Sequence, residues 1–237
     1  MNSLNDYNVT LIDKKLAKNM IEKHHYSRTW STCKYPLGLI KDGFVLGVAN
    51  YGAPVGRLAS DSISPEVTQG NVLELKRLWV AESEGKNTES FFLGQTFAWL
   101  KKNDPKIKVL LSYSDPSHGH TGVIYQATNW IYQGQIRSGV EFFAKVHGEI
   151  LHPRTINVRY GTSGINKIKE IDPKAEIYKI APKHRYIYIL ANKREKKRIM
   201  KSLKYPPLSY PKELDESMVN RIKSLQENPN SEKFFDF

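Results

Sequence analysis

The residue of this chain best placed for chemistry is an aspartate at the end of an apolar run. Asp115 follows residues 107–111, whose length and β-branched content predict a buried strand. A turn at Pro116 and a predicted helix over 119–130 come next. Because α/β proteins bind ligands outside the carboxyl ends of their strands, Asp115 is a candidate site residue. The alternative is that it only caps the following helix.

Tyrosine, histidine and arginine side chains complete the candidate catalytic set. Tyr125, in the helix that follows the aspartate, is either a proton donor or a buried aromatic. His25 and Tyr26 follow a predicted helix over 14–23 and can transfer protons, although a histidine there can also simply interact with the helix dipole. Arg77 lies inside an apolar stretch, so it is either paired with a carboxylate or phosphate near the site or turned to solvent on an edge strand.

No metal site is predicted. His118 and His120 lie close to Asp115 along the chain, but nothing in their spacing fixes a ligand geometry. A single cysteine, Cys33, excludes an internal disulfide and a cysteine-based zinc cluster.

The elements that must position these residues alternate between strand and helix. They are a strand over 72–80, a helix over 88–103, a strand over 107–113 and the helix over 119–130. Short connections make the two strands parallel, with a right-handed crossover. The helix start near Asn87 and Ser90 offers free backbone N–H groups to a phosphate, or is an ordinary capped helix, since no dinucleotide or Walker motif is present.

The other segments are less regular. We expect a hairpin from strands 35–40 and 44–51, an exposed loop over 53–71, strand character over 131–146, a polar turn-rich segment over 152–165, strands over 177–180 and 186–190, a basic run over 193–204 and a helix over 212–226. The boundaries suggest a catalytic domain over 1–192 and a basic, proline-bridged C-terminal extension over 193–237.

The chain is strongly basic. Its 237 residues carry a formal net charge of +12, which indicates a polyanionic partner and favours nucleic acid. A membrane surface is disfavoured because no long apolar span or amphipathic basic helix stands out, and without a signal-peptide pattern we expect a cytoplasmic protein. The candidate nucleic-acid contacts are interleaved with aromatic residues: Arg137, Lys145, Arg154, Arg159, Lys183, Arg185, Lys196, Lys197 and Arg198.

Five motifs taken together carry a family resemblance. They are HHYS (24–27), LELKRLWV (73–80), GKNTES (85–90), SYSDP (112–116) and GVIYQATNWIYQG (122–134). In this order and spacing they resemble the Mom family of phage DNA-modification proteins, which looks like a divergent branch of the GNAT acyltransferase superfamily. The resemblance covers roughly residues 20–135.

The resemblance implies a fold and a site. The fold would be α/β (α+β), a GNAT-like mixed sheet split between the strands over 72–80 and 107–113. An acyl donor would lie in the split, along Leu78, Trp79 and Val80, with Asn87 and Ser90 near any pyrophosphate. One departure is that GKNTES lacks the glycine-rich pyrophosphate loop of ordinary GNAT enzymes. The family's functional positions fall on His25, Tyr26, Arg77, Ser90, Asp115 and Tyr125.

The resemblance also implies a reaction. The acceptor would be the exocyclic amine of adenine in double-stranded DNA, in the host cytoplasm, and the modification would protect phage DNA from restriction. A carbamoylmethyl-adenine product has the composition of adenine plus glycine minus water. The donor is therefore either acetyl-coenzyme A or another acyl-coenzyme A, or glycyl-tRNA. Asp115 would orient or deprotonate the amine, and Tyr125 and Tyr26 would protonate the leaving group or stack on an extruded base.

Two other functions fit the same sequence features. One is a GNAT-type N-acetyltransferase acting on a protein or a small amine. The other is a non-catalytic DNA-binding protein that keeps the fold.

Overall fold

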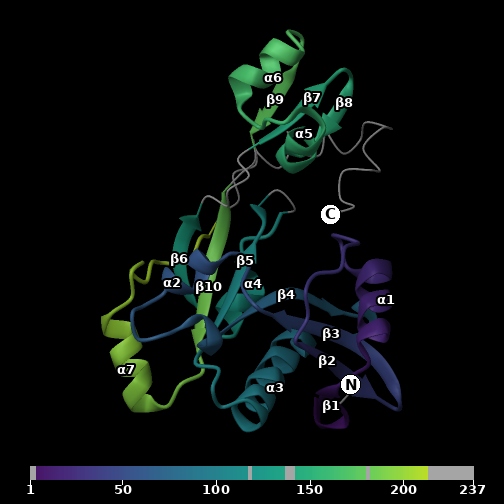
Figure 1. Cartoon of the computed structure of the whole chain (residues 1–237). Coiled ribbons are helices and arrows are strands. Elements are labelled where there is room, and N and C mark those ends of the chain that lie inside the picture. Colours follow the sequence, from purple (N-terminus) through teal and green to yellow (C-terminus); the bar gives the residue numbers. More distant parts are fainter. Residues whose placement is uncertain (1–3, 117–118, 137–141, 180–181, 213–237) are drawn as a thin grey trace.

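The protein has a mixed α/β fold built on two sheets (Figure 1). The computed structural model describes residues 4–116, 119–136, 142–179 and 182–212. The main sheet has seven strands in the order β1-β2-β3-β4-β5-β10-β6, and only the β4–β5 pair is parallel. Its strands are β1 (Asn8–Leu11), β2 (Tyr35–Lys41), β3 (Phe44–Gly52), β4 (Val72–Val80), β5 (Val109–Ser114), β6 (Ile131–Ile136) and β10 (Lys183–Ile189). The predicted mixed fold, the hairpin β2–β3 and strand β4 are confirmed.

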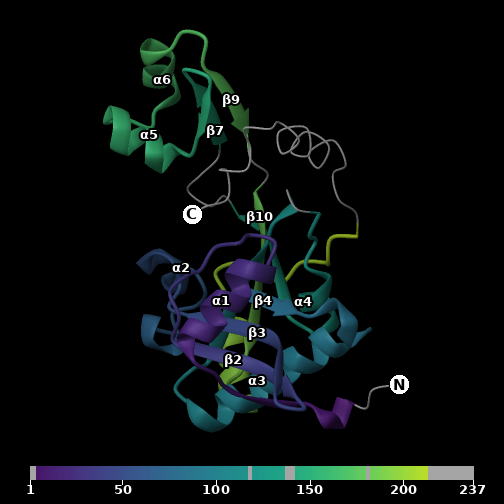
Figure 2. The same cartoon turned by 90° about the vertical axis from the view of Figure 1, so that its right-hand side faces the viewer.

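Helices cover both faces of the main sheet (Figure 2). On one face lie α3 (Thr88–Asn103), which agrees with the predicted helix, and the short α4 (Val123–Ala127). On the other face α1 (Lys14–His24) packs on β3 through Ala17 and Ile21, after an N-terminal cap from Asp13. None of the helices in the described segments is long and apolar enough to cross a membrane.

Two predicted segments need correction. The helix predicted over 119–130 is shortened to α4, because left-handed residues bound it, Gly122 at φ 84° and Asn129 at φ 59°. The loop predicted over 53–71 contains α2 (Arg57–Asp61) and a short 3₁₀ turn at Gln69–Asn71. Further 3₁₀ turns lie outside this loop, at Leu4–Asp6 and Glu82–Glu84. Ile63 and Val67 from this loop are buried against β5 and β10, so it forms part of the core.

The parallel strands β4 and β5 separate after three residue pairs. Their ladder ends at Glu74, which is paired with Leu111, and β4 continues to Val80 without β5. At this point β4 contains a β-bulge at Lys76, the kind of irregularity that bends a strand and increases its twist. The Ser112 hydroxyl donates to the Leu75 carbonyl over 2.8 Å and closes the apex of the separation. The predicted split of the sheet is therefore present.

A second, smaller unit is inserted between β6 and β10 (Figure 1). It consists of the sheet β8-β7-β9 and two helices: β7 (Phe142–Val146), β8 (Glu149–Leu151), α5 (Pro153–Tyr160), α6 (Ile165–Ile171) and β9 (Glu176–Lys179). It has its own apolar core, which includes Ile156 and Ile168. The polar segment expected over 152–165 is thus largely helical. Proline is tolerated in the first turn of a helix, and burial of Ile156 stabilises the rest.

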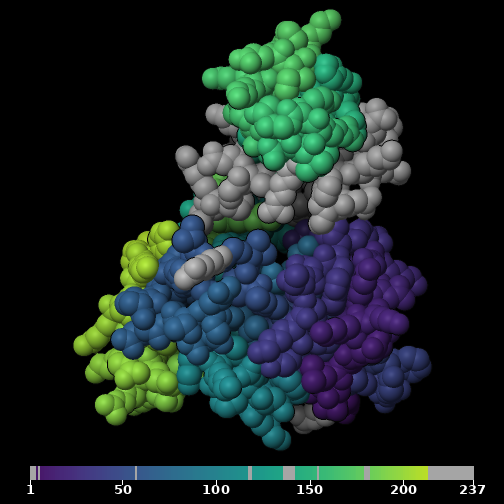
Figure 3. Space-filling model, in the orientation of Figure 1, coloured from purple at the N-terminus to yellow at the C-terminus, as the bar shows by residue number. Residues whose placement is uncertain are grey.

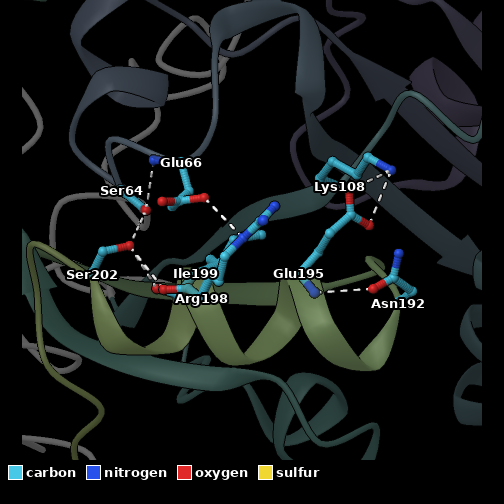
Figure 4. Close-up of polar contacts among 8 residues, drawn as sticks. All are labelled: Ser64, Glu66, Lys108, Asn192, Glu195, Arg198, Ile199 and Ser202. Carbon is cyan, nitrogen blue, oxygen red and sulfur yellow. Dashed lines mark hydrogen bonds and ion pairs between the residues drawn. The ribbon is translucent and has the colours of Figure 1, made fainter.

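The described part of the C-terminal stretch packs on the main sheet. Helix α7 (Lys193–Lys201) inserts Ile199 into the core beside β5 and β10. Figure 4 shows its polar contacts: the Asn192 cap, the ion pairs Glu195–Lys108 and Arg198–Glu66, both at 3.2 Å, and the Ser202–Ser64 hydrogen bond. The Leu208 N–H then donates to the Tyr132 carbonyl and covers the edge strand β6. Most of the helix predicted over 212–226 lies outside the described residues.

Candidate active site

A cavity of about 290 Å³ lies where β4 and β5 separate. Its walls come from the α1–β2 loop, β4, the start of α3, the end of β5 and α4. All five predicted catalytic residues line it, although they come from distant parts of the chain: His25, Tyr26, Arg77, Asp115 and Tyr125. The split sheet is what brings them together, because it opens a space between two strands that would otherwise be hydrogen-bonded.

Asp115 is the first residue after β5 and is held in an ion pair. The Lys183 ammonium, at the start of β10, lies 3.3 Å from its carboxylate. The next residue, His184, is buried opposite Ser114, and its Nδ1 lies 2.7 Å from the Tyr132 hydroxyl. Burial lowers the pKa of His184, while the Asp115 charge opposes this shift. The aspartate thus carries its negative charge at the pocket wall beside a cation rather than serving only as a helix cap.

His25 is oriented by the turn that follows α1. The Ser27 backbone N–H donates to His25 Nδ1 over 3.1 Å, and the Ser27 hydroxyl lies 2.9 Å from the same nitrogen. Since Nδ1 accepts, the neutral ring carries its proton on Nε2. His25 is buried and therefore presents a defined tautomer at the pocket.

Tyr26 is an acid rather than a base at neutral pH. Burial and the Asp115 charge raise the pKa of Tyr26 to about 12, and Arg77 opposes this rise. Although 51% of the residue surface is exposed, its ring lies against both His25, at 4.2 Å between centroids, and His120, at 5.1 Å. The phenol is therefore protonated at neutral pH.

Arg77 anchors the loop that carries His25 and Tyr26. Its guanidinium donates to the Thr29 carbonyl over 3.0 Å, the Thr29 hydroxyl over 2.9 Å and the Lys76 carbonyl over 2.7 Å. The bulge at Lys76 makes this possible, because it shifts the alternation of β4. Three of the five guanidinium protons are thus used within the protein, so Arg77 acts first as a positioning residue.

Tyr125 is buried at the apex of the split. Its hydroxyl lies 2.7 Å from the Ser112 hydroxyl, which also donates to the Leu75 carbonyl. The Ser112 hydroxyl has one proton, and both the Leu75 carbonyl and the Tyr125 oxygen are in position to accept it. Burial raises the pKa of Tyr125 far above its ordinary value. The phenol oxygen is therefore held beside Ser112 at the apex of the split.

The predicted donor-binding strand has the required free edge. Beyond Glu74, β4 pairs with β3 on one side, and on the other it has no strand partner among the described residues. Leu78 lines the cavity and Val80 packs on the core nearby. The Trp79 ring instead stacks on His24 on the opposite face, at 4.8 Å between centroids, so only its backbone can face a donor.

The start of α3 fits a pyrophosphate poorly. Asn87 is exposed and left-handed at φ 70°, and the Ser90 hydroxyl donates to the Asn87 carbonyl. Neither residue lines the cavity; the acidic Glu89 does. Burial raises the pKa of the Glu89 carboxyl. An acidic side chain in the first turn repels an anion, which offsets the attraction of the free N–H groups.

Sequence reasoning gave no site role to several pocket residues, among them Ser114, Lys76 and Val123. The Ser114 hydroxyl is buried and has no hydrogen-bond partner within the described segments. The Lys76 ammonium is also buried, 3.6 Å from Glu74, and burial lowers its pKa. Val123 lines the cavity yet is mostly exposed. Ser114 adjoins Asp115 in SYSDP and Lys76 adjoins Arg77, so adjacency to a candidate was the available signal.

A comparison with protein families matches residues 6–212 to the Mom protein family. The chain belongs to the Mom protein family. It is 29% identical to methylcarbamoylase Mom of Escherichia phage Mu over 201 residues, which cover 83% of this chain and 80% of that protein. The family predicted from the sequence is thus confirmed.

Solved acetyltransferases are similar in overall fold. One is the aminoglycoside acetyltransferase AAC(6')-Ib in complex with ribostamycin and coenzyme A, 13% identical, covering 81% of this chain and 97% of that chain with a TM-score of 0.45. Another is the spermidine/spermine N-acetyltransferase SpeG of Vibrio cholerae, 7% identical, covering 79% and 94% with a TM-score of 0.47. Nothing about the donor or acceptor of this Mom family chain follows from these likenesses.

The basic residues predicted to contact nucleic acid fall into different environments. Four are paired with acids: Lys145 with Glu176, Arg159 with Glu149, Lys183 with Asp115 and Arg198 with Glu66. Arg185 is only 2% exposed and lies over the Tyr205 ring, so its prediction as a contact is corrected. Lys196 and Lys197 are exposed on α7. Arg137 and the side chain of Arg154 lie outside what the structure describes.

The described residues contain no group of three or more histidine, cysteine, aspartate or glutamate side chains that could hold a metal ion. His120 does line the cavity with Asp115, whereas His118 lies outside the described residues.

Proposed function

We propose that this chain is a DNA-modifying transferase that places a glycyl or related acyl group on the exocyclic amine of adenine. The observation that carries the proposal is the convergence of the five candidate groups on one cavity at the split of the sheet. Similarity to methylcarbamoylase Mom of phage Mu and the net charge of +12 support DNA as the substrate. In the host cytoplasm the modification would protect phage DNA from restriction enzymes.

Asp115 and Tyr26 have complementary roles in the transfer. The adenine N6 is a poor nucleophile, so Asp115 accepts its proton as the new bond between N6 and the acyl carbon forms. The bond between that carbon and the donor's oxygen or sulfur breaks, and the Tyr26 phenol gives its proton to the leaving atom. His25 donates from Nε2 to the acyl oxygen, on which negative charge develops. Solvent then returns the proton from Asp115 to Tyr26.

A rearrangement would convert a glycyl product into the carbamoylmethyl group. The glycyl amine attacks adenine C6 through a five-membered ring, and the original C6–N6 bond breaks. The glycine nitrogen then joins the base to the methylene group, and N6 becomes the amide nitrogen. The product contains adenine plus glycine minus water, so atoms balance without an oxidant.

The donor is an acyl-coenzyme A or glycyl-tRNA. The free edge of β4 from Leu78 to Val80 suits an amide-containing arm, but the Glu89 carboxylate at the start of α3 opposes the pyrophosphate of coenzyme A. The same carboxylate would attract the ammonium group of a glycyl ester. Incubating purified protein and duplex DNA with each donor, followed by nucleoside mass spectrometry, decides between them.

The decisive experiment is mass spectrometry of deoxyadenosine from cells that express the chain. We expect an increment of glycine minus water, and feeding ¹⁵N-glycine should label the nitrogen attached to the ring and leave the amide nitrogen unlabelled. An acetyl increment on a protein or small amine would support an N-acetyltransferase instead. Unmodified DNA bound by well-folded protein would support a non-catalytic DNA-binding role.

A further inference from the structure

Val123 is an apolar side chain that projects at the pocket. It is the first residue of α4, it lines the cavity, and 70% of its surface is exposed. A single exposed valine needs no explanation by itself. Val123 differs from such a residue because it lies beside the polar groups of the pocket and because the segment that carries it is supported from beneath.

The support comes from the buried ring of Tyr186 on β10. A Cβ atom added to Gly122 would meet this ring at 2.5 Å, so the backbone that precedes Val123 lies directly on it. The Tyr186 hydroxyl also donates a hydrogen bond to the Thr121 carbonyl. Tyr186 is fully buried and contacts the Tyr125 ring at 5.0 Å between centroids. The segment thus has no room to sink toward the sheet, and the Val123 side chain is held outward.

We propose that Val123 enters the base stack of DNA and fills the space left when the target adenine is extruded into the pocket. This inference rests on the proposed function. An adenine stacked in a duplex cannot reach Asp115 in a cavity, so it must leave the helix, which costs unstacking and unpairing energy. Proteins offset this cost by inserting an apolar side chain between base steps. The inserted group must be apolar, exposed and held beside the pocket, as Val123 is.

The chain provides a matched control. Leu58 on α2 is another aliphatic residue, 79% exposed, and it does not line the cavity. If exposure alone mattered for DNA binding, Leu58→Ser would act like Val123→Ser. If the location beside the pocket matters, only the Val123 substitution has an effect.

The test compares duplex and single-stranded oligonucleotides that carry the same target adenine. Val123→Ser should lower kcat/KM on the duplex by about tenfold or more and lower it much less on the single strand, because only the duplex must be opened. Val123→Leu should retain activity on the duplex, and Leu58→Ser should change neither rate. Thermal unfolding of each variant verifies that it is folded.

A second measurement does not depend on chemistry. With 2-aminopurine at the target position, wild-type protein should raise the fluorescence of the duplex, and Val123→Ser should abolish most of the rise. Equal loss of rate on both DNA substrates, or an unchanged fluorescence rise in the variant, would overturn the proposal. If the wild type modifies neither substrate, the proposed function fails, and the fluorescence comparison still decides the role of Val123.

Discussion

The basic residues beside the pocket and those on α7 have opposite surroundings. At the pocket, the Lys183 ammonium lies 3.3 Å from Asp115, and two residues further along β10 Arg185 is buried beneath Tyr205. On α7, Lys196 and Lys197 are exposed, and neither has an acidic partner within 4.0 Å among the described residues. The first group shapes the site, whereas the second is free to meet phosphates. Similar charges in the sequence therefore serve different purposes.

The location of α7 strengthens this contrast. Its first turn is bound to Lys108, just before β5, whereas Asp115 lies just after β5. The length of the strand, roughly 20 Å at 3.3 Å per residue, separates the two. Figure 3, viewed as in Figure 1, shows α7 in yellow-green at the far end of the main body from the second unit. Contacts on α7 would therefore involve DNA away from the target base.

The largest expected effect on the modification rate comes from comparing two acidic residues, Asp115 at the pocket and Glu66 beside α7, each of which forms an ion pair with a basic residue. Asp115→Asn removes the proposed base and should lower the modification rate by about 10²–10⁴-fold, the range typical of general base catalysis. Glu66→Gln breaks the ion pair with Arg198 on α7 and should leave the rate nearly unchanged. Single-turnover rates with a duplex substrate measure both. A comparable loss in the two variants would remove the distinction between the regions.

The next effect concerns the cations of the same two ion pairs. Lys183→Met leaves Asp115 without its partner and should reduce the modification rate by about 10- to 100-fold through misplacement of the carboxylate. Arg198→Met should have little effect on the rate. Lys183→Arg should recover part of the activity, because it restores the charge. If Lys183→Met instead weakens DNA binding with kcat intact, Lys183 is a phosphate contact, as its sequence context suggested.

The contrast shows what the sequence could and could not predict. Strand β4 and helices α1 and α3 follow from local patterns, and all agree with the structure. The ion pair between Lys183 and Asp115 cannot be predicted from local patterns, because the two residues are far apart along the chain. Charge counting therefore predicted a basic protein but could not reveal that Lys183 is paired with Asp115 or that Arg185 is buried.

The bulge in β4 explains another part of the site that local patterns miss. Simple alternation places Arg77 on the same face as Leu73 and Leu75. In the structure Leu78, not Arg77, follows them into the core, and the guanidinium reaches Thr29. A bulge leaves no clear signal in a mostly apolar strand, so the anchoring role of Arg77 could be recognised only in three dimensions.

A smaller effect is expected for the exposed cations of α7. Replacing both Lys196 and Lys197 by Met should weaken DNA binding several-fold and reduce the salt slope by about 1.8, since each phosphate contact contributes about 0.9. The maximal modification rate should not change. Titrations of a labelled duplex at several salt concentrations give the slope, with Lys193→Met as a further single-charge comparison. An unchanged slope would show that α7 does not meet DNA.

The smallest expected effect is on the pH dependence of thermal stability, which should change with a substitution near Asp115 and not with one on α7. Burial lowers the pKa of His184, which contacts Tyr132 and lies near Asp115, so the folded protein favours the neutral ring. Its contribution to stability is present above the ordinary pKa of 6.5 and is lost as the pH falls through that value, because the unfolded chain takes up the proton more readily. His184→Asn, which can preserve the bond to Tyr132, should reduce the fall in Tm between pH 7 and pH 5 by a few degrees. The double substitution on α7 should leave that fall unchanged, since it does not alter the surroundings of His184. An equal response in both variants would place the pH sensitivity outside the pocket.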